Sequence, residues 1–452
     1  MQPIMFILLP FIVLMCLLFL TRNSLISILG AISAVSYLII VKKNYTVLFF
    51  LENILKTNWV SIFSPSGYLF PLLILVIITF LLTLFEELKI LDSYTLMMSK
   101  SLSKTSNFFF SVLLLCSPLL FFLDDYLSVL GIKNFFAPLV KDTQENKNKL
   151  TAYTVFFSGS GSLLFFLSTW VAVIVTQIKS IQHLVPLWEN KSAIEIFSAA
   201  KPYFFYPIIL YIFSIIQTIS NGKNNFIFKK ESTHQHILWQ DIFIFLLLPV
   251  GIITAFIYQI IINGNALHSI DVSEIMFYGS LISFSTVSFF TFLFKSITLS
   301  FFSNLLKKTI LDLFLPILTL SSCWLFSKLI VLVMNIQTLT ISQSFHAYLY
   351  PLFYFLLSAI IALILGSEWG TFGITISLIP VANSFSNPSV ILGAIISGTL
   401  CGAHLTPLSN IHLTASTIFA VDPMKAYFFR IKNTALLATL TGILYLALGF
   451  FY

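Results

Sequence analysis

Residues 366–371 read Gly-Ser-Glu-Trp-Gly-Thr, and they interrupt a long apolar stretch of the chain. Between Lys328 and Asp422, Glu368 is the only charged residue, although prolines, asparagines and histidines are frequent there. Such a stretch is apolar enough to lie in a bilayer, yet too broken to form simple membrane helices. Broken helices at membrane depth are tolerated only where they are buried in protein or line a cavity. The sequence therefore predicts an internal site built from broken helices.

The composition of the whole chain agrees with a membrane location. Of the 452 residues, 58% are hydrophobic and only 9% are charged, whereas about 25% are charged in an ordinary soluble domain. These charges are too few to cover a soluble protein of this size, which excludes a soluble enzyme, a nucleic-acid binder and a disordered chain. We predict an all-α polytopic membrane protein with about 10–12 transmembrane helices. The net charge of +7 is explained by the basic cytoplasmic loops of such proteins.

Apolar runs give the expected spans. They are 4–20, 24–41, 67–85, 107–123, 150–178, 203–220, 241–263, 275–294, 309–334, 347–366, 371–402 and 408–450. The run 371–402 is expected to hold two short segments, and the run 408–450 a half-helix followed by a full helix. Residues 42–66 are expected to be a polar connection, and residues 191–195 part of a short interfacial helix.

The same pattern suggests how the chain is divided. We expect an N-terminal transmembrane hairpin with its linker in residues 1–66 and a first transporter repeat in residues 67–220. A polar central loop follows in residues 221–240, and residues 241–452 form the second half. A second repeat is expected within that half, at residues 309–420.

Four places carry signals for a broken helix. Two are the run 158–162, Ser-Gly-Ser-Gly-Ser, and residues 366–371. The other two are Asn387-Pro388 and Thr406-Pro407, each read as an N-cap followed by proline at the first helical position. Such breaks expose backbone N–H groups or carbonyls whose partial charges can hold an ion. For the serine–glycine run, close helix packing through small residues is the alternative interpretation.

Asp124 and Asp125 end an apolar run, where a carboxylate at the bilayer centre costs a few kcal/mol. Neighbouring helical positions point about 100° apart, so we expect one carboxylate to face the pathway and the other to pair with a lysine, a hydroxyl or a helix terminus. Ser128, one turn later, is a candidate to share a ligand with Asp124. The alternative is that both aspartates cap a helix in interfacial water.

Glu368 is the second acidic candidate, because desolvation of a lone carboxyl favours its protonated form and suits it to proton coupling. The alternative places it at a helix end in headgroup water. If a helix begins at Pro407, then Ser409, His412 and Ser416 share one face. His404 and His412 are proton-carrying candidates, with a neutral histidine bonded to a backbone carbonyl as the alternative.

At these residues the chain resembles the NhaC-type sodium/proton antiporter family, part of the ion-transporter superfamily. Residues 121–126 (Phe-Phe-Leu-Asp-Asp-Tyr) resemble its F-D-D-Y segment, and residues 168–170 (Ser-Thr-Trp) its S-T-W segment. Residues 366–371 resemble G-T-S-W-G-T, and residues 397–412 resemble S-G-x-x-x-G-D-H-x-S-P-I-S-D. The order and spacing fit over about residues 67–178 and 345–420. The resemblance implies inverted repeats whose broken helices meet near the membrane midplane.

The chain departs from the family pattern at three positions. Ala403 and Asn410 stand where the family has aspartates, and Glu368 stands where it usually has serine or threonine. Two carboxylates near the expected ion site are thus replaced by neutral residues, while one carboxylate is gained nearby.

We therefore expect a secondary active transporter that exchanges Na+ or another monovalent cation for protons by alternating access. The expected ion- and proton-binding residues are Asp124, Asp125, Glu368, His404, Ser409, Asn410 and His412. The residues expected to line the substrate site are Tyr126, Ser158, Ser160, Trp369, Thr371 and Thr406. The alternative cargo is an organic solute, an amino acid or a carboxylate, coupled to H+ or Na+. A non-transporting scaffold is disfavoured because idle membrane carboxylates only cost stability.

No enzymatic activity is expected, because no intramembrane protease or hydrolase motif is found. We expect no cofactor and no metal beyond the transported Na+. The expected partners are the lipid bilayer and the transported cation, proton or organic solute, with a homodimer left open and no nucleic acid. The expected location is the inner or plasma membrane of a bacterium, as a multi-pass protein.

Overall fold

The computed structural model describes residues 3–21, 23–64, 67–93, 97, 112, 114–117, 121–220, 238–262, 271–336, 346–382, 385 and 387–451. Every regular element in these ranges is a helix, and no β-strand occurs among them. The predicted all-α class is therefore confirmed.

Eight helices of the described residues are long and apolar enough to cross a bilayer, or up to ten if each of two bent helix pairs counts as one span. The eight are α2 (Ser24–Lys43), α5 (Leu69–Glu87), α13 (Trp239–Ile262), α14 (Val272–Lys295), α15 (Leu299–Ile336), α16 (Tyr350–Leu365), α18 (Pro388–Leu405) and α20 (Pro423–Gly449). The chain is therefore a multi-pass membrane protein, with a span count that reaches the lower end of the predicted range.

The other α-helices of the described residues are not among these eight. They are α1 (Pro3–Thr21), α3 (Val47–Phe49), α4 (Lys56–Ile62), α8 (Asp125–Gly131), α9 (Gln144–Leu164), α10 (Thr169–Ile181), α11 (Ala193–Ala200), α12 (Phe205–Ser220), α17 (Glu368–Thr375) and α19 (Asn410–Ile418). The α9–α10 pair bends by 53° at its break, and the pair formed by α11 with its extension and α12 bends by 48°. Broken helices are therefore a property of the fold, as the sequence predicted.

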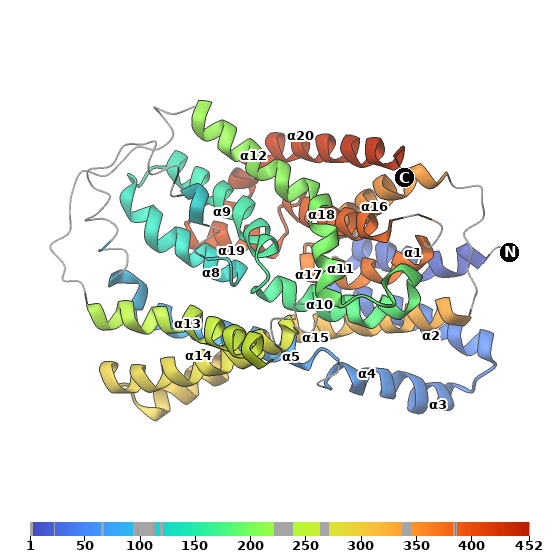
Figure 1. The fold of residues 1–452 in the computed structure, drawn as a ribbon, viewed down its shortest axis with the longest axis horizontal. Helices are drawn as coiled ribbons and strands as arrows, with labels where there is room; N and C mark the ends of the chain where they lie inside the picture. Colours follow the sequence, from blue (N-terminus) through green and yellow to red (C-terminus); the bar gives the residue numbers. More distant parts are fainter. Residues whose placement is uncertain are drawn as a thin grey trace.

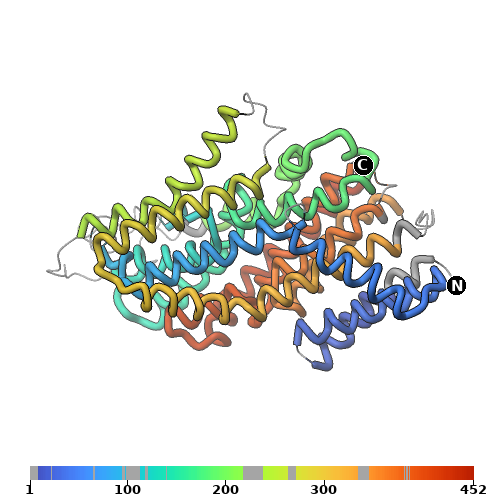
Figure 2. Tube along the Cα trace, turned by 90° about the horizontal axis from the view of Figure 1, so that it is seen from below, coloured from blue at the N-terminus to red at the C-terminus, as the bar shows by residue number. Residues whose placement is uncertain are grey.

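Two helical hairpins flank the molecule (Figures 1 and 2). The hairpin α1–α2 packs on α15, and the hairpin α13–α14 packs on α5 and α10. Both hairpins present large apolar side chains outward, such as Phe19 and Ile261, which are 69% and 73% exposed. In a protein without enough charge to cover its surface, this outer apolar layer is the face that contacts lipid.

Helix α18 lies at the centre of the fold, packed against α16, α12, α17 and α20 (Figure 1). In its membrane-length window 94% of the residues are buried, against 22% in α20. Close packing against α16 needs glycine, because a Cβ on Gly398 or Gly402 would lie 2.2 and 2.1 Å from carbonyl oxygens of α16. The helix that carries the 397–404 motif is therefore fixed inside the protein rather than exposed to lipid.

Several local predictions hold. Asn387 caps α18 with Pro388 at the first helical position. Residues 408–450 contain a half-helix, α19, and a full helix, α20. The short helix expected near 191–195 is α11, and Ser192 and Glu195 form a capping box at its start.

Two local predictions are wrong. Residues 42–66 are not a plain polar connection, because residues 47–62 are helical and include α3 and α4. No helix begins at Pro407: Thr406 is the extended C-cap of α18, and the next helix begins at Asn410. The reason is that the hydroxyl of Ser409 accepts the backbone N–H of His412, which supplies the N-cap three residues later than expected.

The central loop 221–240 and the span 107–123 lie largely outside the described residues. The division of the chain into two repeats stays a prediction.

Candidate functional site

The first acidic residue of the site, Asp124, has an extended backbone conformation and caps α8. Its Oδ1 accepts the backbone N–H of Tyr126 at 2.8 Å, and its Oδ2 accepts the hydroxyl of Thr169 at 3.0 Å. The backbone N–H of Thr169 in turn donates to the carbonyl of Leu123. Asp124 therefore joins the start of α8 to the start of α10, and it does so inside the protein, with 8% of its surface exposed.

Asp125 is the first residue of α8 and is held by two side-chain donors. The hydroxyl of Ser162 donates to Oδ1 at 2.9 Å, and the indole N–H of Trp170 donates to Oδ2 at 2.5 Å. Ser162 lies two residues before the end of α9, and Trp170 is the second residue of α10. The break between α9 and α10 thus orients this carboxylate.

Glu368 opens α17 in the second half of the chain. The break before it depends on Gly366, which has φ +66° and whose missing Cβ would lie 2.7 Å from the carbonyl oxygen of Leu408. Ser367 caps the helix by accepting the backbone N–H of Gly370. Glu368 is 7% exposed, and within the described ranges it forms no ion pair or hydrogen bond with another side chain.

The start of α19 completes the site. The backbone N–H of Asn410 donates to the carbonyl of Gly366 at 3.1 Å, so the break after α16 and the break after α18 touch each other. Four helix N-termini consequently meet in one region: those of α8, α10, α17 and α19. Their N–H ends and their acidic or polar first residues are gathered there by the breaks themselves.

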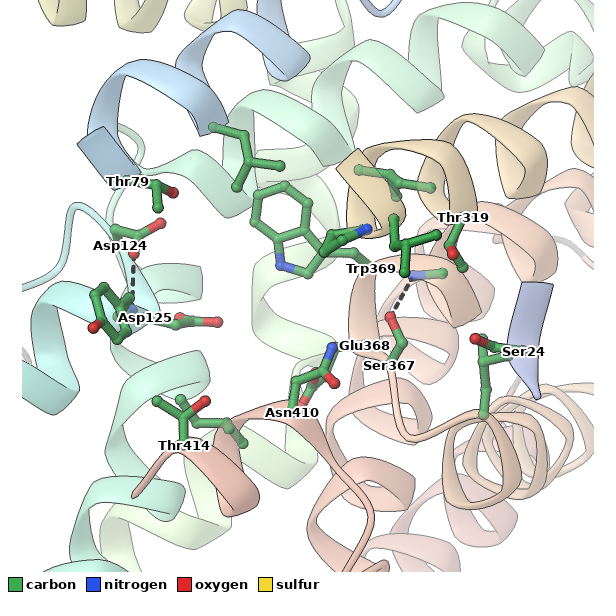
Figure 3. A pocket seen from close by; sticks show the side chains of 18 residues that line it. Ser24, Thr79, Asp124, Asp125, Thr319, Ser367, Glu368, Trp369, Asn410 and Thr414 are labelled. Atoms are coloured by element: carbon green, nitrogen blue, oxygen red, sulfur yellow. Dashed lines mark hydrogen bonds between the residues drawn. The ribbon is translucent and has the colours of Figure 1, made fainter. Parts of the chain in front are cut away.

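A cavity of about 410 Å³ opens between the starts of α8, α17 and α19. In Figure 3, Asp124 and Asp125 lie on one side of it, and Glu368 and Asn410 lie across from them. Its lining residues are Ser24, Leu75, Thr79, Asp124, Asp125, Tyr126, Leu315, Pro316, Thr319, Leu320, Leu365, Ser367, Glu368, Trp369, Gly370, Asn410, Ile411 and Thr414. Three carboxylates line the cavity, and no lysine, arginine or histidine is among these lining residues.

Six of the predicted site residues line this cavity: Asp124, Asp125, Tyr126, Glu368, Trp369 and Asn410. The expected division between the two aspartates is only partly seen, because both reach the cavity although Asp124 is also the helix cap. Ser128 is not among the residues that line the cavity, and its hydroxyl donates to the carbonyl of Phe121 at 3.0 Å.

The other predicted residues surround the cavity without lining it; they are Ser158, Ser160, Thr371, His404, Thr406, Ser409 and His412. Each histidine has a ring nitrogen near one partner: Nδ1 of His404 lies 3.1 Å from the Tyr206 hydroxyl, and Nε2 of His412 lies 2.9 Å from the carbonyl of Pro423. In the serine–glycine run, Ser160 bonds to its own helix, and Gly159 packs close to Leu400. A direct part of these residues in transport stays a prediction.

Sequence reasoning missed several polar residues that line the cavity, such as Thr79 and Thr319, and two residues that lie beside it, Ser162 and Arg430. Ser162 belongs to the quoted serine–glycine run, and its place one helical turn after Ser158 was the available signal. Arg430 is 1% exposed and donates to the carbonyls of His404 and Thr406. Other charged residues lie close to it in residues 422–432. Such a stretch is typical of a segment at the membrane surface, so the sequence did not indicate that Arg430 is buried.

A second charged group lies beside the cavity. The hydroxyl of Tyr126, which lines the cavity, donates to Glu86 at 2.9 Å, and Lys133 lies 3.5 Å from the same carboxylate. Glu86 and Lys133 are partly exposed. Among the described residues, no group of three or more histidine, cysteine, aspartate or glutamate side chains is placed to hold a resident metal ion.

The fold and the cavity define a multi-pass helical membrane protein with an acidic site at the meeting point of broken helices. Residues 163–450 match the model of the Na+/H+ antiporter family, and the chain belongs to this family. The match begins after Asp124 and Asp125 and includes Glu368, Asn410 and Arg430.

A further similarity covers a short part of the chain. An uncharacterised protein of Haemophilus influenzae is 30% identical over 105 residues, which are 23% of this chain and 20% of that protein. The chain thus matches about a fifth of the length of this curated relative.

Proposed function

We propose that the protein is a secondary active transporter that exchanges a monovalent cation, Na+ in the first place, for protons. One observation carries the proposal: the cavity between the starts of α8, α17 and α19 is lined by three carboxylates and by no basic side chain. A desolvated site with this charge attracts cations and disfavours anions. Membership of the Na+/H+ antiporter family supports the same cargo.

The exchange rests on competition between a proton and a cation for the same carboxylates. Asp125 already has two fixed donors, so it offers a positioned negative charge that need not reorganise when a cation arrives. Glu368 forms no hydrogen bond or ion pair with another side chain of the described residues, and we take it as the carboxylate that gains or loses the proton. Neutral oxygens of Asn410, Thr79 and Thr319 line the same cavity and suit a hard monovalent cation.

Alternating access completes the cycle: the cavity is exposed first to one side of the membrane and then to the other. The breaks before α17 and α19 touch through Gly366 and Asn410, which couples these two half-helices in any such movement. We propose the inner or plasma membrane of a bacterium as the location, and the number of copies in the assembly stays open.

An organic cation is the second candidate cargo. The cavity volume of about 410 Å³ far exceeds the roughly 30 Å³ share of one water molecule. Leucines, Pro316 and the indole of Trp369 line it beside the carboxylates, a combination that suits an ammonium group with an apolar substituent. The absence of basic residues from this lining argues against a free carboxylate as cargo. An amino acid would need the helix N-termini to hold its carboxylate.

The test uses purified protein in proteoliposomes with a trapped pH dye and an imposed proton gradient. We expect Na+ or Li+ to collapse the gradient in the wild-type protein. Potassium, methylammonium, propylammonium, amino acids and propionate are added in separate experiments. Each rate is compared with that in protein-free liposomes, because neutral amines cross lipid and collapse the gradient without a protein. Collapse above this background by the organic ammonium ions alone would replace the inorganic cargo with an organic one, and no collapse above background by any cation would contradict the proposal.

A further inference from the structure

The carbonyl ends of two broken helices are occupied by basic side chains of the protein itself. At the end of α18, Arg430 of α20 donates through Nη1 to the carbonyl of His404 and through Nη2 to that of Thr406, the latter at 3.3 Å. The hydroxyl of Tyr427, also on α20, donates to the intervening carbonyl of Leu405 at 3.2 Å. Three successive carbonyls at this break are therefore bound by one neighbouring helix.

The break after α9 has a related arrangement. Lys201, just after α11, donates through Nζ to the carbonyl of Leu164, the last residue of α9, at 2.9 Å. The same ammonium lies 3.4 Å from the centre of the Phe166 ring, in the break itself. The carbonyl end of α18 is buried and that of α9 is partly exposed, with Leu164 37% exposed. Each of the two ends receives a positive charge from another helical segment.

Arg430 forms no close ion pair with a carboxylate in the described part of the chain, and Glu368 interacts with its charge only from a distance. An arginine that is 1% exposed costs free energy unless other groups replace its water shell. The carbonyl end of α18 replaces part of that shell, because a helix C-terminus carries partial negative charge. The guanidinium of Arg430 therefore occupies the carbonyl end of α18, where the partial negative charge would otherwise attract a transported cation.

From this geometry, and resting on the proposed cation exchange, we propose that Arg430 and Lys201 are fixed internal cations. They fill the carbonyl ends of α18 and α9 and confine the transported cation to the carboxylate cavity. Both are positioning residues, since neither lines the cavity. Their effect is on the number of transported cations that bind: with both carbonyl ends filled, the transported cation is left with the cavity between Asp125 and Glu368 among the sites that the described residues form.

The test is the dependence of transport on cation concentration in proteoliposomes. Arg430→Ala vacates the end of α18, so we expect transport at low Na+ to fall by about tenfold, within the range for lost hydrogen bonds to a charged group. We expect millimolar guanidinium to restore it and the Hill coefficient for Na+ to rise above its wild-type value. Arg430→Lys should keep the wild-type cation dependence. Unchanged Na+ dependence in folded Arg430→Ala, or no rescue by guanidinium, would overturn the proposal.

Lys201 gives a test that does not depend on the folding of the Arg430 variants, because Lys201 is only half-buried. Lys201→Met should raise the Hill coefficient and Lys201→Arg should not. Identical cation dependence in these two variants and the wild-type protein would overturn the inference for α9. If the wild-type protein shows no cation-driven proton flux, the proposed exchange itself is wrong. If the wild-type protein shows this flux and the variants have the same cation dependence, only the inference on Arg430 and Lys201 is wrong.

Discussion

The two acidic helix starts of the cavity, α8 and α17, are built alike but held differently. Each follows a break, each has a capping side chain, Asp124 or Ser367, and each begins with a carboxylate, Asp125 or Glu368. Asp125 accepts hydrogen bonds from Ser162 and Trp170, whereas Glu368 accepts none from another side chain of the described residues. The comparison indicates a division of labour in which Asp125 is a fixed charge and Glu368 is the group that exchanges protons.

Removal of the fixed charge is expected to have the largest effect. Asp125→Asn keeps the shape of the side chain but removes the charge that attracts the cation, so transport should fall by roughly 100-fold, the range for charged hydrogen-bonded groups. The measurement is the rate of Na+-driven pH change in proteoliposomes. Asp142→Asn is the matched control, because Asp142 is exposed and pairs with Lys147 outside the cavity. Equal rates in the Asp125 variant and the wild type would place the cation elsewhere.

Neutralisation of Glu368 is expected to change the pH profile as well as the rate. In the wild type, acid protonates Glu368 and so weakens cation binding, which means that the apparent Na+ affinity rises with pH. Glu368→Gln cannot lose a proton, so this rise should flatten and the affinity at alkaline pH should fall by about tenfold. Apparent Na+ affinity across a pH series measures both effects, with exposed Glu189→Gln as the control. A pH profile like that of the wild type would reduce Glu368 to a helix-end residue.

Loss of one donor to Asp125 should have a smaller effect. Trp170→Phe removes the indole N–H but leaves Ser162 in place, so the KM for Na+ should rise about fivefold, with a smaller change in maximal rate. Trp239→Phe is a suitable control because Trp239 is 69% exposed on α13. If the KM does not change, the orientation of Asp125 does not depend on α10.

The smallest effect is expected when an aspartate is introduced at Asn410 or Ala403. These are the two positions at which the sequence resemblance places aspartates in the family. Asn410 lines the cavity and Ala403 is fully buried within α18. Asn410→Asp should therefore strengthen Na+ binding by about threefold, as one added surface-like charge would. Ala403→Asp buries a carboxylate without a partner and should lower the yield of folded protein. Tighter Na+ binding in Ala403→Asp than in Asn410→Asp would show that the cation binds near Ala403 and not in the cavity.

The sequence predicted the helical class, the broken helices and the acidic residues because each depends on local composition. Charges in an apolar run, glycine beside serine and proline after asparagine are visible without any tertiary contact. The positions of Asp125 and Glu368 across one cavity are not visible in this way, since they depend on how α8 and α17 pack. For the same reason the burial of Arg430 was missed: its partners are the carbonyls of a helix some 25 residues earlier in the chain.

Thr406-Pro407 shows the limit of a local signal. A hydroxyl residue before proline is a common helix start, but the chain here uses Ser409 as the cap. The backbone N–H of Asn410 is held by the carbonyl of Gly366, from another break. The helix start is thus fixed by a contact between two distant segments.

Competition between cation and proton is tested most directly by proton release on Na+ addition to purified, weakly buffered protein in detergent. We expect Na+ to release protons from the wild-type protein, with the largest release at a pH where Glu368 is still protonated, and Glu368→Gln to release far fewer. Saturable Na+ binding without proton release in the wild type, at every pH, would contradict exchange at the shared carboxylates.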